Sequence, residues 1–189
     1  MDSIISLLNL VLEWFPRVFF GATIIFAAAA PVHYLKKLAW WAIGFKIFYA
    51  AILSLGQYYV WTLDSFTKPF LNYIFSYSWS RFWMEAMLSI ALAFLFWFFL
   101  KALQKKEERF FESGETELGL VLALAIGWPD FVIFLPFAFL AVALFSLFRH
   151  SFLKEVYTTI RWPFVAAAVL TFLFSGKIFA ILPFLSAIK

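Results

Sequence analysis

The 189-residue sequence contains no cysteine and only two histidines, His33 and His150. The absence of cysteine excludes disulfide bonds, thiolate metal sites and a cysteine nucleophile. Two histidines also leave too few imidazoles for the usual zinc sites. We therefore expect this protein to use neither a metal ion nor another cofactor.

Charge is scarce as well. Only 14% of the residues are charged, whereas soluble domains carry about a quarter. In contrast, 65% are hydrophobic and 23% aromatic, including 28 Phe and 9 Trp, more apolar surface than a domain of this size can bury. The composition predicts an all-α polytopic transmembrane bundle, one domain over residues 1–189, in contact with membrane lipids. The net charge of +4 is expected to set membrane orientation rather than to bind nucleic acid.

A transmembrane helix needs about 20 mainly apolar residues, and the sequence predicts about six such helices. The fourth is short alone and gains a turn if it begins near Gly114. The pair Pro129-Asp130 predicts a tight turn, so the fourth and fifth helices should form a hairpin. The expected spans are 4–30, 38–63, 82–103, 118–128, 131–147 and 163–185.

Residues 64–81, DSFTKPFLNYIFSYSWSR, fit no full span. Their apolar core, 69–79, would rise only about 16 Å as a helix. We expect a short helix that lies at the membrane interface or crosses only partly. The two alternatives place Asp64 on opposite sides of the membrane.

Basic residues predict the orientation. Cytoplasmic loops of membrane proteins are enriched in Lys and Arg, and such residues gather in and beside 104–114 and 149–161. Two expected crossings separate these loops, so both should lie on the cytoplasmic side of the cell membrane. The basic residues are Lys101, Lys105, Lys106, Arg109, Arg149, Lys154 and Arg161.

Several stretches are similar to a known family. GETELGLVLALAIGWP (114–129) resembles a block of the prepilin peptidases, or type IV leader peptidases, which include the archaeal preflagellin peptidases. IRWPFVAAAVLTFLFSGKI (160–178) resembles a later helix of that family, and LDSFTKPFLN (63–72) its first catalytic block. These enzymes are intramembrane aspartyl proteases with a GxGD motif. The resemblance implies cleavage of a prepilin-like leader at the cytoplasmic membrane face, without a cofactor.

The same resemblance implies a catalytic pair, Asp64 and Glu115. It also places Gly114, Asn72 and Glu117 at motif positions that support the site or bind substrate. An aspartyl protease needs two carboxyl groups that share a proton across a water molecule, and their proximity separates their pKa values. If the pair exists, the carboxyls should lie within about 6 Å of each other.

The chain departs from the family pattern. It has Glu112-Ser113-Gly114-Glu115 in place of GxGD, so the second catalytic Asp becomes Glu, and Glu117 replaces a Lys. A displacement of about 1 Å can cost about 100-fold in rate. Glu115 also has a structural interpretation, because an acid in a first helical turn favours the helix dipole and Ser113 is a possible N-cap.

Three hypotheses therefore stay open. The first is an active peptidase. The second is a non-catalytic relative that keeps the helical scaffold and binds a pilin-like or other membrane partner. The third is an unrelated small membrane protein that acts as a subunit of a membrane complex.

Overall fold

A computed structural model describes residues 2–63, 71–106, 111–153 and 159–181. Within these ranges the side chains of 2–13, 63, 71–72 and 152–153 are not described. The described secondary structure is entirely helical. Its elements are α1 (Asp2–Ala29), α2 (Val32–Leu63), α3 (Leu71–Ser78), η2 (Trp79–Trp83), α4 (Met84–Lys106), α5 (Glu115–Ile126), α6 (Phe131–Phe148), η4 (Arg149–Leu153) and α7 (Arg161–Ile181).

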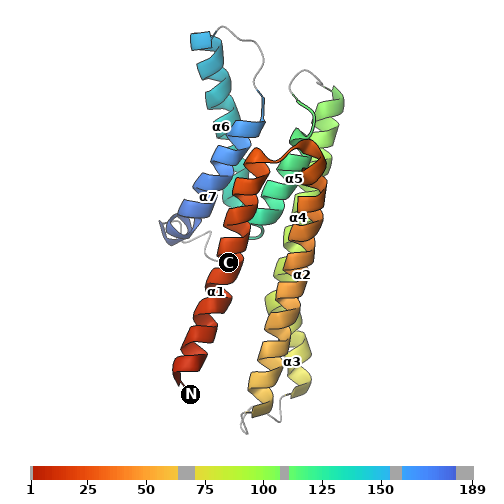
Figure 1. Ribbon diagram of the computed structural model, residues 1–189, viewed down its shortest axis with the longest axis vertical. Helices are drawn as coiled ribbons and strands as arrows, with labels where there is room; N and C mark the ends of the chain where they lie inside the picture. Colours follow the sequence, from red (N-terminus) through yellow and green to blue (C-terminus); the bar gives the residue numbers. More distant parts are fainter. Residues whose placement is uncertain (1, 64–70, 107–110, 154–158, 182–189) are drawn as a thin grey trace.

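The long helices run roughly alongside one another, with α5 inside the bundle (Figure 1). α1 and α2 are antiparallel and join at Ala30-Pro31, and α4 returns antiparallel to α2. α5 packs against α4, α2, α1 and α7, whereas α6 packs mainly against α7. The fourth expected helix therefore lies at the centre of the fold.

Four helices are long and apolar enough to cross a membrane: Val32–Thr62, Tyr73–Lys106, Phe131–Ser151 and Arg161–Ile181. The expectation of about six spans is not confirmed. In the first helix, the apolar segment with described side chains is the shorter Trp14–Ala29. α5 has 12 residues and rises only about 18 Å, less than the hydrocarbon core of about 30 Å. Its length alone is therefore too short for a full span, and it lies inside the bundle.

The expected short helix within 64–81 is part of a longer rod. Residues 64–70 lie outside the described structure, but α3 continues through the π-helical turn η2 into α4. Ser80 Oγ donates to the carbonyl oxygens of Ser76 and Tyr77 across this turn. Trp83 Nε1 donates to Ser54 Oγ of α2 at 3.0 Å. The exposed Arg81 thus lies within a helix and not at a helix boundary.

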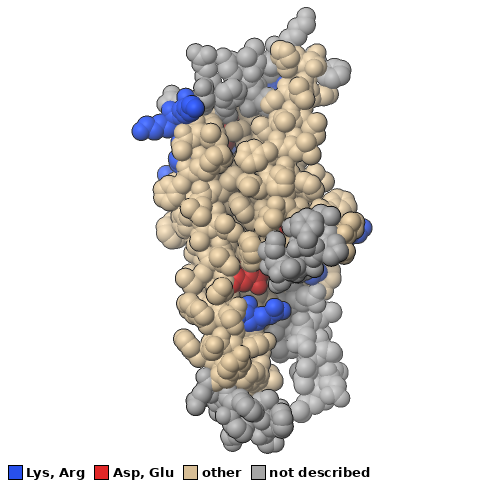
Figure 2. All heavy atoms as spheres, turned by 180° about the vertical axis from the view of Figure 1, so that it is seen from behind, with Lys and Arg blue, Asp and Glu red and all other residues tan. Residues whose placement is uncertain are grey.

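The helix surface suits a lipid environment. Many large apolar side chains are exposed, among them Trp40 at 70% and Trp41 at 73%. Soluble monomers rarely expose contiguous apolar patches of more than a few hundred Å². On the face in Figure 2, charged side chains are sparse and uncharged residues cover most of the described surface. These features support a membrane protein in contact with lipid.

More than half of the basic residues that the structure describes lie at one end of the bundle, which we call the basic end. It contains the α1–α2 connection, the end of α4 and the starts of α5 and α7 (Figure 1). The basic end carries Lys36, Lys37, Lys101, Lys105, Lys106 and Arg161.

Every residue of α5 is buried. Leu118, Val121, Leu122 and Leu124 are all at or below 1% exposure. A Cβ on Gly119 would collide with the side chain of Leu100 on α4, so this glycine allows the close approach of the two helices. α5 therefore forms the centre of the protein core. Polar side chains contact it at its two ends.

Candidate functional site

Gly114 fixes the start of α5. It is the N-cap residue, with φ +89°, a left-handed conformation that favours glycine. A Cβ at this position would lie 2.6 Å from Val32 Cγ2, so side chains are excluded by space as well as by conformation. The side chain of Val32 occupies the space beside Gly114. This contact places Glu115 against the α1–α2 corner.

The Glu115 carboxylate accepts hydrogen bonds from backbone N–H groups on both sides of the junction. Glu115 is 3% exposed. Its Oε2 accepts from Glu112 N at 3.0 Å, and its Oε1 from Arg161 N at 2.9 Å. The N–H of Ile160 also acts on the carboxylate. Glu115 thus closes the turn that begins α5 and caps the N-terminus of α7, where backbone N–H groups have no helical partner.

Arg161 extends this junction to the end of α1. Its Nε and Nη2 donate to the carbonyl oxygen of Ala28 at 3.2 and 2.9 Å, and Nη2 donates to that of Ala30 at 2.8 Å. The last carbonyl groups of a helix lack helical partners and favour a cation. We call this set the Glu115–Arg161 junction, since its two side chains join α1, α5 and α7.

A small cavity borders the junction. It is lined by both polar and apolar groups and has a volume of about 10 Å³. That is close to the space one water molecule needs and far below a peptide-binding cleft. The lining residues are Leu35, Glu112, Ser113, Gly114, Glu115, Leu118 and Arg161.

Burial raises the pKa of Glu115 above its ordinary value. The backbone N–H groups of Glu112, Arg161 and Ile160 act in the opposite direction, because they stabilise the ionised form. The charge of Glu112 adds to the upward shift. Glu112 is exposed, so the acid acting on Glu115 within the described part of the chain lies at the protein surface.

Glu117 has a different partner. It lies in the first turn of α5 and is buried. Its Oε1 lies 3.0 Å from Lys101 Nζ, and its Oε2 accepts from Thr116 Oγ1 at 2.8 Å. Burial raises the pKa of Glu117, but the contacts with Lys101 and Thr116 outweigh it and leave the pKa below its usual value. Glu117 therefore links α5 to α4 through its ion pair with Lys101.

The other expected catalytic residue, Asp64, lies outside the described residues. Leu63, which precedes it, ends the 32-residue helix α2. Val32, which begins α2, contacts the position of Gly114. Leu63 is therefore about 47 Å along the helix from the residue beside Glu115. The described residues give no support to a pairing of Asp64 with Glu115.

Asn72, also expected near the site, lies in the first turn of α3, and its side chain is not described. α3 begins the rod that reaches the basic end only at Lys106. The structure thus gathers Gly114, Glu115 and Glu117 at the start of α5 and leaves the backbone of Asn72 at the other end of the bundle.

A second polar cluster lies at the far end of α5. Gly127, the C-cap, has φ +68°, and a Cβ there would lie 2.6 Å from Lys46 Nζ and 3.0 Å from Ser89 Oγ. Trp128 N donates to Ser89 Oγ at 2.8 Å. The Lys46 ammonium lies 4.5 Å from the centroid of the Phe20 ring.

Lys46 therefore places a cation beside the C-terminus of α5, the end that favours positive charge. Glu85 and Asp130 also act electrostatically on this lysine. From the sequence, Arg161 was expected only as a basic residue of a cytoplasmic loop and not as part of the site. The available signal was the pair of glycines, Gly114 and Gly127, that brackets a short apolar run.

The part of the chain that the structure describes contains no group of three or more His, Asp or Glu residues able to hold a metal ion. Comparisons of the chain with protein-family models, curated proteins and solved structures find no match.

Proposed function

We propose that this protein is a non-catalytic multi-pass membrane protein whose helical bundle serves as a scaffold for a helical, prepilin-like membrane partner. The observation that supports the absence of catalysis is that the Glu115 carboxylate is already hydrogen-bonded within the fold. Both of its carboxylate oxygens accept backbone hydrogen bonds, one from Glu112 and one from Arg161.

A two-carboxylate protease needs one acid that activates water and one that polarises the scissile carbonyl. Glu115 instead stabilises two helix starts. The cavity beside it holds about 10 Å³, roughly one water molecule and no peptide. Besides Glu115, the charged residues that line the cavity are the cation Arg161 and the exposed Glu112. These features favour a structural carboxylate.

An active peptidase is the second candidate, and one observation favours it. Glu115 is buried immediately after a glycine with positive φ, and burial raises its pKa, as expected for an acid that holds a proton in a catalytic pair. This candidate requires Asp64 or Glu112 to approach Glu115 in another conformation.

The two candidates differ in one experiment. The protein is co-reconstituted in liposomes with a prepilin-like protein, and leader cleavage and co-purification are both measured. We expect co-purification without cleavage for the wild type, Glu115→Gln and Glu112→Gln. Cleavage that is lost in Glu115→Gln while the protein stays folded would establish the peptidase. Absence of both cleavage and co-purification would refute a scaffold for this class of partner.

We further propose that the basic end faces the cytoplasm, because basic residues concentrate there. The natural chain has no cysteine, so single cysteines can report on the side of the membrane. Ser113→Cys, at an exposed residue of the basic end, should react with an impermeant maleimide only after cells are opened. Ser65→Cys, in the connection after α2, should react in intact cells. The reverse pattern would overturn this orientation.

A further inference from the structure

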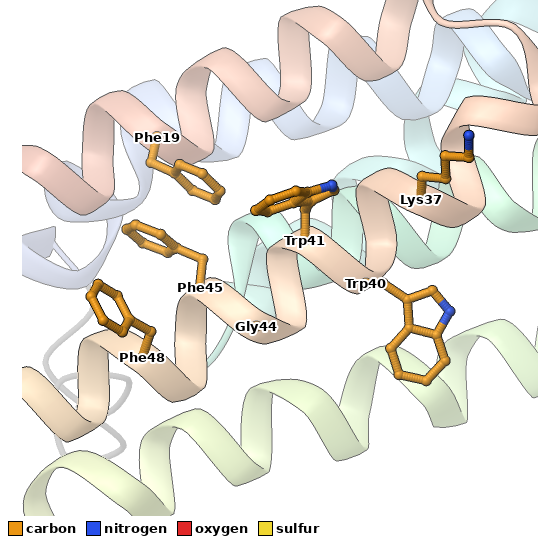
Figure 3. A pocket seen from close by; sticks show the side chains of 7 residues that line it. All are labelled: Phe19, Lys37, Trp40, Trp41, Gly44, Phe45 and Phe48. Carbon is orange, nitrogen blue, oxygen red and sulfur yellow. The ribbon is translucent and has the colours of Figure 1, made fainter.

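An exposed groove runs along α2 beside α1 and is separate from the Glu115–Arg161 junction. It has a volume of about 620 Å³, within the range of small-molecule sites. Its centre is Gly44, where a Cβ would have no heavy atom within 4 Å. The missing side chain leaves a hollow between the rings of its neighbours, which Figure 3 shows.

Aromatic rings form the walls of this groove. Phe19 of α1 stacks on Phe45 of α2 with ring centroids 3.7 Å apart and planes 8° from parallel. Trp41 lies on the same side as this stack, and Trp40 lies on the opposite side of Gly44 (Figure 3). The lining is thus almost wholly apolar, which suits a hydrocarbon chain.

The groove has a charged end. Among the residues whose side chains the structure describes, Lys37 is the one ionisable residue of the lining. It lies near the start of α2 at the basic end. Lys37 is exposed, and its ammonium lies 5.6 Å from the centroid of the Tyr34 ring. Within the described part of the chain, no acidic residue lines the groove, so Lys37 is available to an anion.

The length of the groove indicates what kind of molecule lies in it. From Lys37 to Phe48 the helix rises about 16 Å, roughly half of a hydrocarbon core of about 30 Å. A transmembrane partner helix would need a surface that continues through both leaflets. A lipid of the leaflet at the basic end would place its headgroup beside Lys37 and an acyl chain over Gly44.

We propose that this groove is a binding site for an anionic phospholipid, with its phosphate paired to Lys37 and one acyl chain held between the aromatic walls. Basic pockets between transmembrane helices are a known form of anionic headgroup recognition. The acyl chain buries apolar surface in the groove, and Lys37 provides the preference for a negatively charged headgroup.

The test measures lipid binding to the purified full-length protein by native mass spectrometry. Phosphatidylglycerol and phosphatidylcholine with identical acyl chains are added separately. We expect tighter binding of phosphatidylglycerol. Lys37→Gln should weaken it about fivefold, the size expected for one lysine near an anionic surface, and remove the preference over phosphatidylcholine. Gly44→Leu should abolish the tight site for both lipids by filling the hollow.

The chain offers matched controls. Lys36→Gln removes the same charge from a residue outside the groove. Gly56→Leu introduces the same side chain on α2, at another glycine with no heavy atom within 4 Å of its Cβ position. Both should bind phosphatidylglycerol like the wild type. Equal binding of the two lipids by the wild type would overturn the proposal. So would equal effects of Lys36→Gln and Lys37→Gln, or a change of oligomeric state in place of lipid loss. Lys37→Gln keeps the proposal testable if Gly44→Leu does not fold.

Discussion

Replacement of Glu115 tests whether its carboxylate holds the fold together. Glu115→Ala leaves the N–H groups of Glu112, Ile160 and Arg161 without their acceptor. Loss of a helix cap costs about 1 kcal/mol. Each buried donor left unpaired costs about 1–3 kcal/mol, partly offset because a buried charge is also removed. We expect Glu115→Ala to lower the free energy of unfolding by about 2–4 kcal/mol.

Glu115→Gln should have a smaller effect. Its amide retains one carbonyl acceptor but turns an NH₂ group toward a backbone N–H, so one hydrogen bond is lost. We expect a loss of about 1–2 kcal/mol. Glu112→Gln is the matched control, because it removes the same charge three residues earlier from an exposed side chain and leaves the backbone N–H of residue 112 in place.

The assay is equilibrium unfolding by SDS in mixed micelles, followed by the fluorescence of the 9 tryptophans. The expected order of stability is wild type and Glu112→Gln, then Glu115→Gln, then Glu115→Ala. If Glu115→Ala were within about 0.5 kcal/mol of the wild type, an ordinary surface value, the capping role would be wrong. Equal losses for Glu112→Gln and Glu115→Gln would also contradict it, because they would show a general effect of charge.

Three further predictions concern the other anchors of α5. Arg161→Lys keeps the charge but not the planar fork that reaches two carbonyl groups, so unfolding should become easier by about 1 kcal/mol; an unchanged SDS midpoint would contradict this. Gly127→Ala should lower the free energy of unfolding by about 1–3 kcal/mol, because the φ of this residue is positive. Adding Lys46→Met to Gly127→Ala should recover only the part of this loss that comes from the contact between the new Cβ and the Lys46 ammonium. The lowered pKa of Glu117 means that its ion pair stabilises the fold above the unfolded pKa of about 4.3 and that this contribution is lost as the pH falls through the folded pKa. Lys101→Met should flatten this acid-side loss, and an unchanged profile would refute the assignment.

The sequence predicts the helical class and the membrane environment correctly, because both follow from composition and from long apolar runs. The number of spans was harder to predict, because hydropathy counts apolar residues and does not report their surroundings. After its first turn α5 is apolar all round, as expected of a helix in lipid, but other helices surround it. Its short length, set by Gly114 and Gly127, was the visible sign that it differs from the four longer helices.

The site was predicted only in part. The acids at the start of α5 were identified from their position, and Glu115 and Glu117 are both buried there. Their partners were not identified, because Arg161 and Lys101 are distant in sequence and no helical spacing connects them to α5. Local spacing predicts contacts within one helix, whereas these contacts depend on how four helices pack around a fifth.

The charged residues at the two ends of α5 are explained by the position of this helix in the fold. A half-length helix within the bundle has unpaired N–H groups at one end and unpaired carbonyl groups at the other, and in a membrane the deeper end has little access to water. Gly114 contacts the start of α2, and Gly127 contacts Lys46, 14 residues further along it, so α5 runs parallel to α2. Acids lie at the N-terminus of α5 and a cation at its C-terminus, as the helix dipole favours. A catalytic role for Glu115 would leave its position at the N-terminus of α5 unrelated to the placement of the other charged residues. The capping reading explains Glu115, Glu117 and Lys46 by one physical cause, and for that reason we favour it.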